Sequence, residues 1–210
     1  MSANLKILET SLSFKKKTEQ AMLREIEDRI NKNKKKAERQ IASLVPSWVL
    51  ASPEVQSIAQ DGVPGSLHAQ FGLFSGTGDI VANDIANALA KSVSLEVDFT
   101  KRLKGTSVTF FIQPTSFVNL LEIPLGEIRT ATGDVLPWMR WLLLEGTRTI
   151  VSSYTYEPDN SGRSGGGTMR LGGIWRVPPE FSGTASENFV TRIFQNKNRQ
   201  IQPILKGLLL

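Results

Sequence analysis

The chain of 210 residues contains no cysteine and one histidine, His68. The lack of cysteine excludes disulfides, thiolate zinc sites and cysteine nucleophiles, and it is typical of folding in a reducing cytoplasm. One histidine provides too few ligands for a transition-metal site, so we expect no metal and no cofactor. The longest apolar runs are far shorter than the roughly 20 residues that span a bilayer. We therefore expect no contact with a membrane, and the first residues do not resemble a signal peptide.

Positive charge is in excess, but only at one end of the chain. The net charge is +5. Residues 1–45 hold eleven Lys or Arg and six Asp or Glu, whereas residues 46–210 hold fourteen of each kind. Because the larger part is neutral, the basic composition does not indicate a polyanion-binding surface there.

Glycine and proline are absent from residues 5–44, which consist largely of good helix formers. A narrow seven-residue repeat predicts a helix that ends at Val45–Pro46, and a break near Ser11–Ser13 would shorten it. The repeat consists of Leu23, Ile30, Ala37 and Leu44, with Ile26, Asn33 and Gln40 beside it. At 1.5 Å per residue the helix is roughly 60 Å long, longer than such a domain is wide. We therefore expect a basic helical arm over 1–45 and a single body over 46–210 that folds without residues 1–44.

The lysines of the arm leave three interpretations open. Glutamates interleaved with them indicate a solvated helix face, the same face can pack on another protein, and clustered lysines can contact a nucleic-acid backbone. The only aromatic residue in the arm is Phe14, so stacking on bases is hardly available. The residues of the arm that we expect to contact a partner are Lys15, Lys16, Lys17, Leu23 and Ile30.

The rest of the chain mixes helical spacing with strand-like alternation. We expect helices over 53–59, 79–91, within 134–146, and from Thr184 (with Glu187 completing a capping box) until Pro203 kinks or ends the last one. We expect strands over 67–71, 93–99, 108–112, 147–158 and 168–177, with turns at 61–65 and Gly105. This pattern predicts an α+β fold, in which an antiparallel sheet is packed by helices and a long N-terminal helical arm projects.

Residues 160–183 read NSGRSGGGTMRLGGIWRVPPEFSG and contain a G-x-S-x-G pattern centred on Ser164. A nucleophile elbow requires a helix after the serine and a histidine downstream, but a strand is expected here and His68 lies far upstream. A phosphate-binding loop fails as well, because Thr168 and Met169 follow Gly167 where Lys and Ser or Thr are required. His68 itself is expected on the face of its strand opposite Leu67 and Ala69, as a solvated or hydrogen-bonded side chain. We therefore expect no catalytic residue and no enzyme, and we interpret the glycines as providing backbone freedom.

The same stretch, continued to Phe194, resembles the C-terminal part of neck and tail-completion proteins of tailed bacteriophages. The likeness is carried by a glycine-rich segment followed by Trp175-Arg176-Val177-Pro178-Pro179-Glu180-Phe181 and Gly183-Thr184. The resemblance implies a non-enzymatic virion protein of the neck, assembled in the host cytoplasm as a homo-oligomeric ring. Sixfold symmetry is favoured and twelvefold is the alternative. It further implies portal or adaptor and tail proteins as partners, with genomic DNA passing through the channel without sequence-specific contact.

On this interpretation the glycine loop and the Trp-Pro-Pro-Phe segment lie at the interface between subunits or partners, with packing inside the monomer as the alternative. The residues concerned are Gly165, Gly166, Gly167, Trp175, Arg176, Pro178, Pro179 and Phe181. The second hypothesis for the whole chain is a nucleic-acid-associated protein that uses its basic N-terminal helix.

Overall fold

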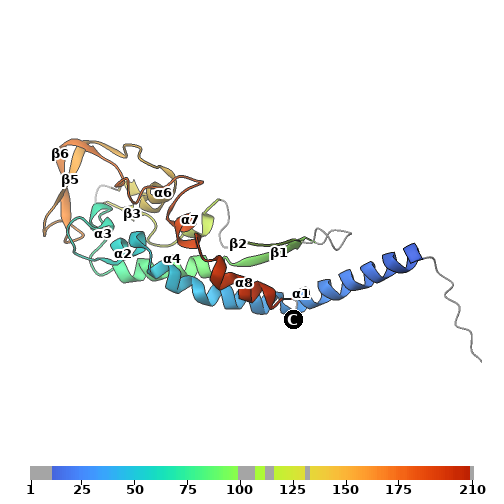
Figure 1. Cartoon of the computed structure of the whole chain (residues 1–210). Helices are drawn as coiled ribbons and strands as arrows, with labels where there is room; N and C mark the ends of the chain where they lie inside the picture. The colour runs from blue at the N-terminus through green and yellow to red at the C-terminus, as the bar shows by residue number, and fades with distance from the viewer. Residues whose placement is uncertain (1–10, 99–106, 112–115, 131–132, 209–210) are drawn as a thin grey trace, which may run out of the picture.

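The structure is a computed structural model that describes residues 11–98, 107–111, 116–130 and 133–208 (Figure 1). Within these ranges the helices are α1 (Ser11–Leu50), α2 (Pro53–Ala59), α3 (Leu67–Gln70), α4 (Gly78–Lys91), α5 (Val118–Leu121), α6 (Trp138–Leu144), α7 (Phe189–Phe194) and α8 (Asn198–Lys206). The strands are β1 (Ser94–Asp98), β2 (Ser107–Phe111), β3 (Ile128–Arg129), β4 (Val135–Leu136), β5 (Val151–Pro158) and β6 (Gly167–Trp175). The predicted turn at Gly105 and residues 5–10 of the predicted first helix lie outside the described ranges.

The fold is α+β with a long N-terminal helix, as predicted. Among the described residues the strands form three separate antiparallel ribbons, β1–β2, β3–β4 and β5–β6, instead of one sheet. The register pairs Leu95 with Phe110 in the first ribbon and Tyr154 with Leu171 in the last. Ribbon β5–β6 lies at one end of the molecule, while β1–β2 and the start of α1 extend toward the other (Figure 1). Helices fill the space between the two ends.

Helix α1 continues past the point where the sequence predicts its end. Pro46 lies inside it, and the helix ends at Leu50. A proline inside a helix costs about 3 kcal/mol because it removes a hydrogen bond and crowds the preceding turn. The two residues that the extra turn buries, Trp48 (7% exposed) and Val49 (0% exposed), offset this cost, since each large apolar side chain contributes about 1.5–3 kcal/mol. Tertiary packing therefore overrides the proline.

Residues 67–71 are not a strand, and that prediction is wrong. Leu67–Gln70 form the short helix α3 and Phe71 caps its C-terminus. Ser66 caps the first turn, because its hydroxyl accepts a hydrogen bond from the Ala69 N–H at 3.1 Å. Leu67, Ala69 and Phe71 are buried, and so is His68 between them. The apolar alternation was misleading because the segment is buried on all sides, not on one face.

The predicted capping box at Thr184 is also misplaced. Helix α7 begins four residues later, where Asn188 accepts hydrogen bonds from the N–H groups of Val190 and Thr191, and Thr191 completes the box. Thr184 closes a turn instead, since its hydroxyl accepts a hydrogen bond from the Glu187 N–H at 3.2 Å. The break before α8 falls at Asn196, whose φ is 65°. Pro203 lies within α8 and does not end it.

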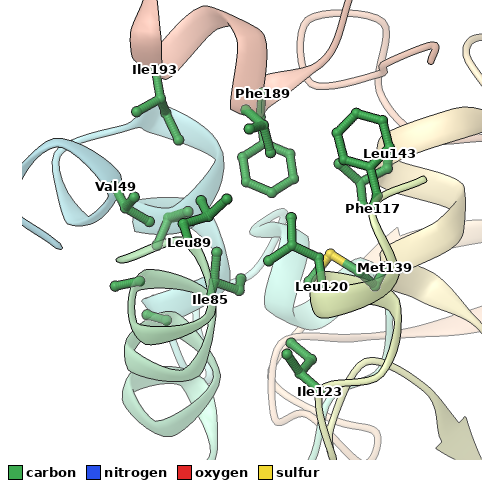
Figure 2. Packing of buried hydrophobic residues seen from close by; sticks show 14 of the residues in the cluster. Val49, Ile85, Leu89, Phe117, Leu120, Ile123, Met139, Leu143, Phe189 and Ile193 are labelled. Atoms are coloured by element: carbon green, nitrogen blue, oxygen red, sulfur yellow. The ribbon is translucent and has the colours of Figure 1, made fainter. Parts of the chain in front are cut away.

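The core lies where α4, α5, α6 and α7 meet the second half of α1 (Figure 2). Ile85 and Leu89 of α4 face Leu120 of α5 and Phe189 of α7, and Met139 of α6 closes the cluster (Figure 2). Helix α1 packs against α4 and is buried at Ile30, Ala37, Ile41, Val45, Trp48 and Val49. The core therefore extends across residue 45, and its elements do not all lie beyond Pro46.

Candidate functional site

The most elaborate polar and aromatic arrangement in the described structure surrounds the glycine loop between β5 and β6. The loop docks on the segment of residues 61–76, which contains α3. The Tyr156 hydroxyl joins the two, since it donates to the Gly166 carbonyl at 2.7 Å and accepts from the Gly65 N–H at 2.9 Å. Burial raises the pKa of Tyr156, although the bond from Gly65 acts in the opposite direction. The phenol therefore keeps its proton at neutral pH and remains a donor.

Arg163 provides the second anchor of the loop. Its Nε donates to the Gly72 carbonyl at 2.7 Å, and its guanidinium lies 5.1 Å from the centre of the Phe74 ring. A cation over an aromatic face contributes about 0.5–1 kcal/mol at an exposed site. Burial lowers the pKa of Arg163 from its ordinary value. The arginine thus joins the glycine loop to the backbone at Gly72, a long-range pair for which the sequence holds no local signal.

The glycines permit close approach between the loop and this platform. A Cβ on Gly166 would lie 2.6 Å from the Ala69 Cβ and 2.9 Å from the Val63 carbonyl oxygen. A Cβ on Gly167 would lie 2.6 Å from the Tyr156 ring. Gly165 is half-buried with φ of 72°, a conformation that L side chains rarely adopt. Gly166 and Gly167 thus serve packing within the chain, and Gly165 permits the turn of the backbone.

Beside the docked loop lies an apolar groove of about 490 Å³. It lies between the β5–β6 ribbon and α3, and its aromatic lining comes from Phe71, Trp141, Tyr154, Tyr156 and Trp175. Tyr154 and Met169 are 41% and 39% exposed, so the groove is open to solvent on the ribbon side. An open aromatic groove suits an apolar side chain or segment better than a small polar ligand.

Trp175 lies inside the monomer, as the alternative interpretation of this segment expected. It is 5% exposed, its ring meets the rings of Trp141 and Phe71 at 5.7 Å and 6.1 Å, and its Nε1–H donates to Gln70 at 3.4 Å. Burial to this degree leaves Trp175 little surface beyond its edge on the groove, and Gly166 and Gly167 are buried as well.

The other residues of the Trp-Pro-Pro-Phe segment are more accessible. Arg176 and Pro179 are exposed, while Pro178 and Phe181 are half-buried. The segment turns back at Pro178, whose carbonyl accepts from the Phe181 N–H at 2.9 Å. These four residues are therefore the part of the predicted interface that remains reachable by another molecule.

An ion pair between Arg192 and the buried Glu54 links the end of the Trp-Pro-Pro-Phe segment to α2 and α7. The sequence did not indicate this pair. Arg192 of α7 donates from Nε and a terminal nitrogen to one oxygen of Glu54, at 2.9 Å and 2.8 Å, and also to the carbonyls of Phe181 and Ser182. Glu54 is 4% exposed. The two charged residues are 138 positions apart, so sequence spacing could not pair them.

Ser164 and His68 are both buried, with exposed fractions of 1% and 0%. The Ser164 hydroxyl accepts a hydrogen bond from the Gly166 N–H at 3.3 Å, which stabilises the loop itself. Neither ring nitrogen of His68 has a hydrogen-bond partner among the described residues. The prediction that His68 lies on the strand face opposite Leu67 and Ala69 is wrong, because the segment is the helix α3 and all three side chains are buried.

The arm divides into two parts. Lys15, Lys16 and Lys17 are exposed and Leu23 is half-buried. Ile30, which was expected to contact a partner, is 1% exposed and belongs to the core of its own chain. Packing against the body thus begins at Ile26, which lies half-buried against the core, and residues 11–29 lack a fully buried side chain.

Over the described ranges, no three His, Asp or Glu side chains are grouped so that they could hold a metal ion. In the same residues, no helix has the length and apolar character needed to cross a membrane. No family model, curated protein or solved structure matches this chain.

Proposed function

We propose that this chain is a non-enzymatic structural protein of a tailed bacteriophage, forming a ring in the neck that joins the DNA-filled head to the tail. The observation that carries the proposal is the first part of α1, which extends away from the body (Figure 1). Its apolar side chains Leu12, Phe14 and Met22 are 81%, 63% and 52% exposed. Apolar groups gathered on a projecting element favour burial against another subunit.

Two further observations support an assembly role. The glycine-rich stretch and the phrase around Trp175 resemble neck and tail-completion proteins. The glycine loop, which carries the G-x-S-x-G pattern, is occupied with packing against residues 61–76, and the Ser164 hydroxyl supports the Gly166 backbone. A serine nucleophile requires a base within hydrogen-bond reach, whereas the hydrogen bond described for the Ser164 hydroxyl, from the Gly166 N–H, has a structural role.

The proposed partners are other copies of this chain, six being favoured over twelve, together with portal or adaptor proteins on one side and tail proteins on the other. The exposed part of α1 contacts a neighbour, and Arg176, Pro179 and the open side of the aromatic groove provide further contact surface. DNA passes through the ring without sequence-specific contact. The protein resides in the virion neck after assembly in the host cytoplasm.

The proposal is tested by adding charge to the apolar part of the arm. The double variant Leu12→Asp, Met22→Asp should fold, because both side chains are exposed, but should fail to restore head–tail joining to particles that lack the protein. The matched control Gln20→Asp, Asn31→Asp adds the same charge at exposed polar positions of the same helix and should join normally. Normal joining by the apolar double variant would contradict the proposal.

The second candidate function is contact with nucleic acid, which the exposed side chains of Lys15, Lys16 and Lys17 favour. Phosphate contacts of this kind make the logarithm of affinity fall linearly with the logarithm of salt concentration. If this function is correct, a plot of the logarithm of duplex DNA affinity against the logarithm of salt concentration should have a steep negative slope. Its magnitude should become smaller by about 3 when all three lysines are changed to Gln. We expect weak binding whose slope does not change in that variant.

A further inference from the structure

His68 is the only histidine of the chain, and its side chain is fully buried. Neither ring nitrogen makes a hydrogen bond of normal geometry within the described residues, although the Phe74 backbone and Asp61 lie close enough to favour the protonated form. A buried polar atom without a partner costs about 1–3 kcal/mol, so the fold tolerates an unfavourable group at this position. Its nearest charged neighbour is Asp61, with an Oδ2 atom 3.7 Å from Nε2.

Asp61 closes the segment in which His68 lies. The carboxylate precedes α3, and its Oδ2 atom accepts a hydrogen bond from the Gly76 N–H beyond the helix. The same oxygen therefore faces both the imidazole and the far end of residues 61–76. A change in the charge of His68 acts directly on the group that holds the two ends of this segment together.

The platform of the glycine loop is this same segment. Gly65 donates to Tyr156, Gly72 accepts from Arg163, and Ala69 and Val63 lie against Gly166. Helix α3 packs against α2 and β6. The charged side chains on the neighbouring elements are Asp61, Arg163 on the loop, Glu54 on α2, Arg170 on β6, and Asp79 in the first turn of α4. Of these, Asp61 is the one whose charge acts on the imidazole.

We propose that His68 and Asp61 form a proton-operated latch, in which protonation of the buried imidazole loosens residues 61–76 and releases the docked glycine loop. An imidazolium in this position carries a charge without water around it, and it competes with Gly76 for the Asp61 carboxylate. Opening of the segment brings the imidazolium into solvent. This removes the cost of an unsolvated charge and ends the competition with Gly76 for the Asp61 carboxylate. The device is independent of whether the chain forms a ring.

The direction of the pH effect follows from linkage. Burial lowers the pKa of His68 from its ordinary value of 6.5, while Asp61 and the backbone of Phe74 oppose the shift in part. The opened segment, with an ordinary pKa, therefore binds the proton more readily than the docked one. The docked state has its full stability above pH 6.5 and loses it as the pH falls below that value. Opening therefore becomes more frequent at pH 5.5 than at pH 7.5, and about tenfold is the upper limit that linkage allows for one imidazole with an ordinary pKa in the opened state.

The test combines a histidine titration with hydrogen exchange on the full chain. In an NMR titration, the imidazole resonance of the single histidine needs no assignment by mutagenesis. We expect the midpoint of its change with pH to lie below 6.5. Protection factors of the Gly65 and Gly76 amides, which donate to Tyr156 on the ribbon and to Asp61, should fall between pH 7.5 and 5.5, by at most about tenfold. In His68→Gln, which cannot titrate, they should not change across this range.

Asp61→Asn provides a second variant if His68→Gln does not fold. An Asn oxygen can still accept from Gly76, but the charge is lost, so the His68 midpoint should fall further. A midpoint at or above 6.5 in the wild-type chain would overturn the latch. Protection factors that do not change with pH, or that decline equally in His68→Gln, would also overturn it.

Discussion

Removal of residues 1–44 should unfold the protein, although the sequence alone predicts that the body folds without them. The deletion removes Ile30, Ala37 and Ile41, which are 1%, 3% and 0% exposed and pack in the core. It also uncovers the face of α4 that α1 covers. A shorter deletion of residues 1–22 is the matched control, since residues 11–22 are exposed or half-buried.

The expected size of the effect follows from burial. Each isoleucine contributes about 1.5–3 kcal/mol when fully buried, and Ala37 adds somewhat less. The sum of roughly 4–7 kcal/mol is comparable to the whole stability of a domain, about 5–15 kcal/mol. The shorter deletion should change the free energy of unfolding by about 1 kcal/mol or less, since the loss of exposed side chains has little effect.

Urea unfolding followed by tryptophan fluorescence and circular dichroism measures both variants. We expect a cooperative transition for the chain without residues 1–22 and a weak or absent one for the chain without residues 1–44. Ile41→Ala provides a milder version and should cost about 2–5 kcal/mol. A chain without residues 1–44 that unfolds at the wild-type urea concentration would refute the assignment of α1 to the core.

Three further substitutions test the candidate site, each by urea unfolding. Gly166→Ala should cost about 1–3 kcal/mol because its Cβ would meet Ala69, whereas Gly62→Ala, with open space around it, should cost about 1 kcal/mol from backbone strain; equal costs would contradict the packing role. Arg192→Met should cost about 3 kcal/mol because it leaves Glu54 buried without its partner, and adding Glu54→Gln should restore part of the loss. Ser164→Ala should cost about 1 kcal/mol and leave head–tail joining intact; loss of joining by a folded variant would reopen a catalytic role.

The elements with strong local signals were predictable from the sequence. Ser52–Pro53 indicated the start of α2, and the structure confirms it, with the Ser52 hydroxyl accepting from the Val55 N–H. The helical spacing of residues 79–91 is confirmed as α4, and the alternation on either side of the glycine loop is confirmed as β5 and β6. In each case the residues that decide the conformation are neighbours in the chain.

The predictions that were wrong concern segments whose conformation depends on contacts between residues far apart in the chain. Helix α1 continues through Pro46 because Trp48 and Val49 are buried in the core. Leu67–Gln70 are helical because the segment packs against α2 and β6. The residues that anchor the glycine loop could not be predicted from the sequence either. Tyr156 and Arg163 each reach a backbone atom 91 residues away, and no spacing rule links such positions.

The size of the particle that the purified chain forms in solution tests the central claim most directly. Native mass spectrometry of the full chain, at micromolar concentration and physiological salt, measures its copy number without assumptions about shape. We expect a closed ring, with six copies favoured over twelve, and the double variant Leu12→Asp, Met22→Asp should shift the population to the 23.2 kDa monomer. A wild-type chain that remains monomeric at the highest attainable concentration would contradict the account.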